Sequence, residues 1–194
     1  AQEPGEPDPA FAVPRDAPCF ALADVLPDPG LEIVFLDGKG VSAATLAEPT
    51  VLRRLATLPG FFDFADSQSL PEWRLLLPGR GPGARDEILF PVATGYRLLR
   101  PGAGATLEPG EEFPVLPDVA VEASANRSFA VSKALPRPVL RDLDGDGLLD
   151  FFVSDPSGAP QILVYRGKPG GRFAREPEVR AGPSLHREIK GDIL

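Results

Sequence analysis

The sequence predicts an all-β protein built from short antiparallel strands. Of the 194 residues, 20 are Gly and 24 are Pro, and each proline costs roughly 3 kcal/mol in a helix interior. A helical bundle is therefore excluded. The apolar residues, 43% of the chain with 12 Phe among them, gather in short runs that are bounded by Gly, Pro and Asp. Such runs are typical of strands rather than helices, and they are numerous enough to form a core.

A repeated pattern organises these runs into three units. Each unit has a strand candidate, a loop rich in Gly, Pro and Asp, and two further runs joined by a short turn. The central run contains an acid near its start, at Glu32, Glu87 and Asp150. The strands expected before the loops are 20–25, 73–77 and 139–143. The two runs expected after the loops are 31–35 and 41–46, 86–90 and 96–99, and 149–153 and 162–165.

Units of this size with about four strands are typical of β-propeller blades. The predicted blades are residues 17–60, 61–122 and 123–183, with the start of a further blade at 184–194. The segment 47–58 has weak helical character, but we expect the strand repeat to continue through it. Residues 1–16 are acidic and rich in Pro, which predicts a linker or arm.

Three blades would form only part of a propeller, because propellers close with about four to eight blades. A three-blade arc leaves open sheet edges and apolar blade faces, which are a liability for a free monomer. We therefore expect the propeller to be completed by another protein chain or by further residues of the same protein.

The loop of the third unit contains the residues that indicate chemistry. Aspartates stand at positions 1, 3, 5 and 9 of the segment 142–150, and Gly147 at position 6 permits a sharp turn. Ca²⁺ takes about six to eight oxygen ligands, whereas the rigid shell of Mg²⁺ fits less well. Alternate residues of a tight loop can direct their carboxylates at one centre. The predicted calcium ligands are Asp142, Asp144, Asp146, the carbonyl of Leu148, and Asp150.

Electrostatics favours an ion in this loop. Four carboxylates so close in sequence repel one another, so we expect the loop to be poorly ordered without a cation. An EF-hand would need a Glu at position 12, where Val153 stands. The alternative is an ordinary Asp/Gly turn that binds nothing.

The loop pattern D-x-D-x-D-G-x-x-D, followed by the apolar run Phe151 to Val153, resembles the FG-GAP/VCBS-type calcium-binding repeat. That family forms integrin α-like β-propellers, so the resemblance implies a propeller stabilised by Ca²⁺ but no single function. The loop of the first unit keeps Asp24, Asp28 and Glu32, and whether they bind a second ion is left open. The loop 79–87 of the second unit has lost its first three acids and is predicted to be metal-free.

Charge and hydropathy exclude two classes of partner. The formal charge is −8, with 28 acidic and 20 basic residues, and no basic stripe suggests nucleic-acid binding. No apolar stretch approaches the ~20 residues of a transmembrane helix. The chain contains no Met and begins with Ala1, which favours a processed protein that is secreted, periplasmic or on the cell surface.

Motifs of catalysis are missing from the sequence, which has no nucleophile elbow, Walker loop or zinc-protease motif. His186 is expected to be a surface residue, and Cys19 a small buried hydrophobe that has no internal disulfide partner. Trp73, Tyr96 and Tyr165 are expected in the core, with a sugar-binding platform as the alternative.

These features together predict a non-catalytic, calcium-stabilised binding module or a subunit of an extracellular or cell-envelope protein complex. Its partners would be protein chains, with a glycan as a further possibility. The alternative is the N-terminal part of a propeller enzyme, or a carbohydrate-binding accessory domain, with its active residues beyond this chain.

Overall fold

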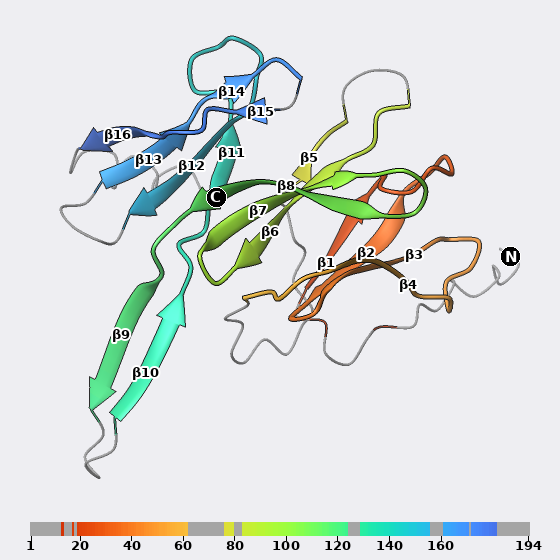
Figure 1. The fold of residues 1–194 in the computed structure, drawn as a ribbon, viewed down its shortest axis with the longest axis horizontal. Helices are drawn as coiled ribbons and strands as arrows, with labels where there is room; N and C mark the ends of the chain where they lie inside the picture. The colour runs from red at the N-terminus through yellow and green to blue at the C-terminus, as the bar shows by residue number, and fades with distance from the viewer. Residues whose placement is uncertain are drawn as a thin grey trace, which may run out of the picture.

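The computed structural model describes residues 13, 17, 19–61, 76–79, 83–123, 129–155, 161–170 and 172–181. Within this part of the chain the regular elements are strands, without a helix (Figure 1). All paired strands are antiparallel. The prediction of an all-β protein made of antiparallel strands is therefore confirmed.

Three four-stranded sheets follow one another along the chain (Figure 1). The first is β1 (Cys19–Ala23), β2 (Glu32–Asp37), β3 (Gly40–Ala44) and β4 (Arg53–Thr57). The second is β5 (Leu76–Leu77), β6 (Glu87–Val92), β7 (Gly95–Pro101) and β8 (Leu107–Pro114). The third is β11 (Val139–Arg141), β12 (Asp150–Asp155), β13 (Gln161–Tyr165) and β16 (Glu178–Ala181).

Each predicted run overlaps a strand at the expected place in its unit. The central runs 31–35, 86–90 and 149–153 correspond to β2, β6 and β12. The segment 47–58, for which a helix was considered, contains strand β4. The propeller arrangement and the predicted blade boundaries stay predictions.

Two hairpins lie outside the repeated pattern, and the sequence did not predict either. Strands β9 (Asp118–Ala123) and β10 (Phe129–Ala134) pair only with each other among the described strands, and they project from the three larger sheets (Figure 1). This hairpin spans residue 123, where the third unit was expected to begin. Strands β14 (Gly167–Lys168) and β15 (Arg172–Phe173) form a small hairpin between β13 and β16.

Glycine starts the third strand of the first two sheets for a steric reason. Gly40 and Gly95 have φ angles of 137° and 140°. A Cβ atom at Gly40 would lie 2.1 Å from the carbonyl oxygen of Ala56, and one at Gly95 would lie 2.1 Å from that of Phe113. Only glycine fits both the backbone angle and this close approach to the fourth strand.

The middle sheet is covered on both faces, which explains the continuous apolar run of β6. Ile88 and Phe90 belong to a core shared with the first sheet, whereas Leu89 belongs to a core shared with the third sheet. Because successive side chains of a strand point to opposite faces, a strand buried on both faces has apolar residues at consecutive positions. The two cores therefore join the three sheets in sequence order.

The core between the second and third sheets is aromatic. Phe151 is fully buried, and its ring centroid lies 5.0 Å from that of Phe113 and 5.4 Å from that of Tyr165. The Tyr165 hydroxyl donates to the Pro114 carbonyl at 3.3 Å, so the buried phenol is satisfied. Tyr96 is likewise buried, with 2% of its surface exposed. The prediction that both tyrosines pack in the core is confirmed.

Cys19 is also buried as predicted, with 1% of its surface exposed. Burial raises the pKa of its thiol to about 12. The predictions for Trp73, His186, most of the arm 1–16 and the segment 184–194 lie outside the described residues. In the described part of the chain, no helix is long and apolar enough to pass through a bilayer.

Replacing Phe151 with Ala is expected to destabilise the fold by about 3–5 kcal/mol, because it leaves a cavity in the aromatic core. Urea unfolding monitored by far-UV circular dichroism would measure this loss. Val139→Ala is the matched control, because Val139 is 42% exposed in the neighbouring strand. Equal losses in the two variants would contradict the assignment of Phe151 to the core.

Candidate metal centre

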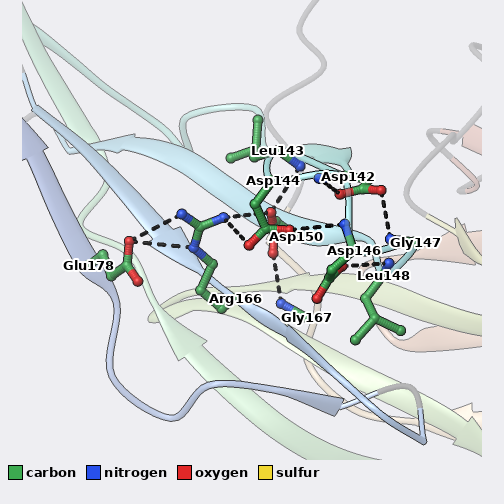
Figure 2. A network of polar contacts seen from close by, with 11 residues as sticks. Asp142, Leu143, Asp144, Asp146, Gly147, Leu148, Asp150, Arg166, Gly167 and Glu178 are labelled. Atoms are coloured by element: carbon green, nitrogen blue, oxygen red, sulfur yellow. Dashed lines mark hydrogen bonds and ion pairs between the residues drawn. The ribbon is translucent and has the colours of Figure 1, made fainter.

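The acidic loop connects β11 to β12, and the pair Arg141–Asp150 closes it. Gly145 and Gly147 have φ angles of 80° and 81°, which permit the tight turns of this loop. The side chains of Asp142, Asp144 and Asp146 gather on it (Figure 2), and each offers a carboxylate oxygen within 4.8 Å of the other two. The structure thus brings together three of the five predicted ligands: Asp142, Asp144 and Asp146.

Backbone N–H groups of the loop already stabilise these carboxylates. Asp142 accepts from Gly145 N at 2.7 Å and from Gly147 N at 2.9 Å. Asp146 accepts from Leu148 N at 2.8 Å. The hydrogen bond from Gly147, followed by those from other loop N–H groups, lowers the pKa of Asp142 below its ordinary value. We expected a poorly ordered loop in the absence of a cation from the repulsion of the carboxylates alone, and that argument did not take these N–H donors into account.

Asp150 has a different environment from the other three aspartates. It is buried, with 2% of its surface exposed. Its carboxylate accepts from Leu143 N at 3.0 Å, from Gly167 N at 2.8 Å and from the Arg166 guanidinium at 3.1 Å (Figure 2). Asp150 therefore joins the loop to strands β12 and β14, and the structure does not place it in the group of three. Its role as a ligand, like that of the Leu148 carbonyl, stays a prediction.

Arg166 is the important residue that the sequence did not reveal. It follows β13, and its guanidinium contacts Asp144 Oδ2 at 3.0 Å as well as Asp150 Oδ2 at 3.1 Å. On its other side it contacts Glu178 Oε2 at 3.4 Å (Figure 2). The hydrogen bond that Arg166 donates to Glu178, followed by the charges of Glu178, Asp150 and Asp144, raises the pKa of Arg166 above its ordinary value. One cation thus bridges the acidic loop and the edge strand β16.

An arginine occupies the corresponding position in the second sheet. Arg166 lies one residue beyond the strand pair Phe151–Tyr165, and Arg100 lies one residue beyond the pair Ile88–Leu99. Arg100 contacts Glu87 Oε1 at 3.2 Å. Both arginines stand opposite the first acid of the central strand, Asp150 for Arg166 and Glu87 for Arg100. A search of the sequence at the position that pairs with this acid could have located them.

The acid that closes each loop has the same backbone partner in all three units. Asp150 accepts from the N–H of Leu143, Glu32 from that of Val25 at 2.8 Å, and Asp86 from that of Gly79 at 3.0 Å. Each of these donors lies seven residues before its acid. The second unit uses Asp86 for this purpose, one residue before the Glu87 that the repeat pattern had equated with the other acids.

The acids of the first unit do not form a comparable group within the described residues, where the structure assembles only the cluster of Asp142 with its two neighbours. Glu32 is buried and accepts from Val25 N and Leu26 N. Burial raises the pKa of Glu32 above its ordinary value. This geometry gives no support to a second ion there.

The chemistry of the third loop fits a hard cation. Carboxylate oxygens are the ligands that Ca²⁺ prefers, and each carboxylate offers about four lone-pair sites. A carboxylate that accepts one or two N–H groups therefore still has lone pairs for an ion. Cys19 is a poor nucleophile, because burial leaves 1% of its surface exposed and raises the pKa of its thiol.

A cavity of about 340 Å³ lies between this loop, the start of the second sheet and the small hairpin β14–β15. Its wall includes apolar side chains of β5, the acidic loop and β15, and charged side chains of β6, of the loop before it and of the hairpin. Representative lining residues are Leu77, Arg85, Leu149, Arg172 and Phe173. Its volume is at the lower end of the range of small-molecule pockets, about 300–1,000 Å³.

Comparisons with known proteins give little guidance. No protein-family model and no solved structure matches the chain. The chain is 29% identical over 203 aligned positions to a protein named alanine racemase from Janthinobacterium sp. (strain Marseille). That alignment covers 89% of this chain and 54% of the other protein. The chain therefore spans about half the length of this curated relative.

Asp150→Ala is expected to destabilise the metal-free protein, because it leaves the N–H groups of Leu143 and Gly167 without their acceptor. Both hydrogen bonds are only partly buried, so each lost acceptor is expected to cost about 1 kcal/mol, the lower end of the range for unsatisfied groups. Chemical denaturation in EGTA would measure the loss. Asp146→Ala removes the same charge from an exposed position and is expected to cost about 0.5 kcal/mol or less. Similar losses for the two variants would refute the anchoring role of Asp150.

Proposed function

We propose that the chain is a non-catalytic binding module that Ca²⁺ stabilises, with an FG-GAP/VCBS-like propeller architecture. The observation that carries this proposal is the convergence of Asp142, Asp144 and Asp146 in a tight loop between two strands. The succession of four-stranded antiparallel sheets, joined through shared cores, supports the architecture.

In this proposal the carboxylates of Asp142, Asp144 and Asp146 hold the ion, with the Leu148 carbonyl and Asp150 as further predicted ligands. A bound Ca²⁺ would neutralise the carboxylate charges and stiffen the connection between β11 and β12. The backbone hydrogen bonds to Asp142 and Asp146 orient these side chains before an ion arrives. Asp142 and Asp146 thus need little reorganisation on binding.

The partners of the module would be other protein chains, or the rest of the same protein, that complete the propeller. Glycan is a further possible ligand. The net charge of −8 argues against nucleic acid as a partner. We place the protein outside the cytoplasm, as a secreted, periplasmic or cell-surface component, because calcium concentrations there suit weak extracellular calcium sites.

The alternative is part of a propeller enzyme or a carbohydrate-binding accessory domain. The cavity beside the acidic loop is the observation that favours it, because a pocket with apolar walls and a few charged groups is the usual form of a small-molecule site. The match to a protein named alanine racemase is too distant to transfer an activity.

Calcium is expected to raise the thermal midpoint of unfolding by several degrees, because a ligand at 100 times its Kd stabilises a folded protein by about 2.7 kcal/mol. Differential scanning calorimetry with and without EGTA would measure the shift. Asp144→Ala should abolish most of it, whereas Asp28→Ala in the first unit should leave it unchanged. A midpoint that does not respond to EGTA would contradict the metal assignment.

Alanine racemisation is one specific activity that would contradict the non-catalytic proposal. The purified chain is expected to leave L-alanine unchanged when D-alanine is measured by chiral chromatography. A known alanine racemase serves as the positive control. Turnover above the rate of a heat-denatured sample would overturn the proposal in favour of the enzyme.

A further inference from the structure

The acidic loop contains its own cation. The guanidinium of Arg166 contacts Asp144 Oδ2 at 3.0 Å and Asp150 Oδ2 at 3.1 Å. Its side chain is only 21% exposed, so it is packed against the loop rather than extended into water. Two of the predicted metal ligands thus share one positive charge that the protein itself supplies (Figure 2).

Arg166 also has a carboxylate partner away from the loop. Glu178, the first residue of β16, accepts from Arg166 Nε and Nη2 at 3.4 Å each. The contacts to the loop use Nη1, so the guanidinium faces two acidic groups from opposite sides. Glu178 could therefore keep Arg166 paired when the loop carboxylates turn to another cation.

We propose that Arg166 competes with Ca²⁺ for the carboxylates of Asp144 and Asp150, so that it stabilises the ion-free loop and weakens calcium binding. This inference rests on the proposed calcium site. Arginine and Ca²⁺ prefer the same carboxylate oxygens, and they repel each other when both lie near them. At contact range in water this repulsion corresponds to about a tenfold change in affinity.

The contacts of Asp150 distinguish two roles for Arg166: competition with Ca²⁺ for the carboxylates, and support of the carboxylates in a geometry that binds Ca²⁺. If Arg166 only positioned Asp150 for the metal, its loss would weaken calcium binding. Asp150, however, has two backbone donors besides Arg166, at Leu143 and Gly167, and these hold its carboxylate in place. Removal of the guanidinium therefore frees the carboxylates of Asp144 and Asp150 without releasing Asp150.

Isothermal titration calorimetry with CaCl₂ on the full chain tests the proposal. Arg166→Gln is expected to lower the Kd for Ca²⁺ about tenfold and to lower the thermal midpoint measured in EGTA. Arg166→Lys keeps the charge and should bind Ca²⁺ nearly as the unmodified chain does. Arg54→Gln is the matched control: it breaks an Arg–Asp pair with Asp37 in the first sheet and should leave the Kd unchanged.

A second variant tests the inference if Arg166→Gln does not fold. Glu178→Gln removes the alternative partner of Arg166 and should weaken calcium binding, because the guanidinium then has only the loop carboxylates. A Kd that is unchanged or higher in Arg166→Gln, or unchanged or lower in Glu178→Gln, overturns the competition while the calcium site stands. Failure of every protein, the unmodified chain included, to bind Ca²⁺ overturns both the inference and the proposed function.

Discussion

The hydrogen bond from a backbone N–H to an acid seven residues later is the constraint on which each unit depends. Glu32, Asp86 and Asp150 close their loops through this bond and so fix how the first strand enters the sheet. A slip of one residue would move every side chain of that strand to the opposite face. The cores that join the sheets require this register, because the middle sheet contributes alternate residues to each of them.

The sequence predicted the strands of the repeated units well, because apolar runs and turn residues are local signals. It missed the hairpin β9–β10, whose connecting residues 124–128 contain neither Gly nor Pro. It also equated Glu87 with Glu32 and Asp150, although Asp86 closes the second loop. The second loop is one residue longer than the first and third loops. The difference becomes clear only from the strand pairing, in which Leu77 lies opposite Glu87.

The part of the candidate site that depends only on the spacing of residues within one loop could be predicted from the sequence. Asp142, Asp144 and Asp146 meet because alternate residues of one tight loop can face the same centre. The environment of Asp150 depends on Arg166, which lies 16 residues away and reaches it through the pairing of β12 with β13. That information lies in the pairing of two strands and not in the spacing of the aspartates, so the electrostatic argument from the loop alone treated the four acids as uncompensated.

Arg100 in the second sheet corresponds to Arg166 in the third, although the second loop lacks the series of aspartates. The second and third units thus each have an arginine that faces the first acid of the central strand, whether or not the loop has the series of aspartates, whereas Thr45 stands at this position in the first unit. Under the proposed function, dependence on calcium would therefore be confined to the third unit. Ca²⁺ would stiffen the connection between β11 and β12, while the second unit, whose loop lacks the aspartates, would not respond to it.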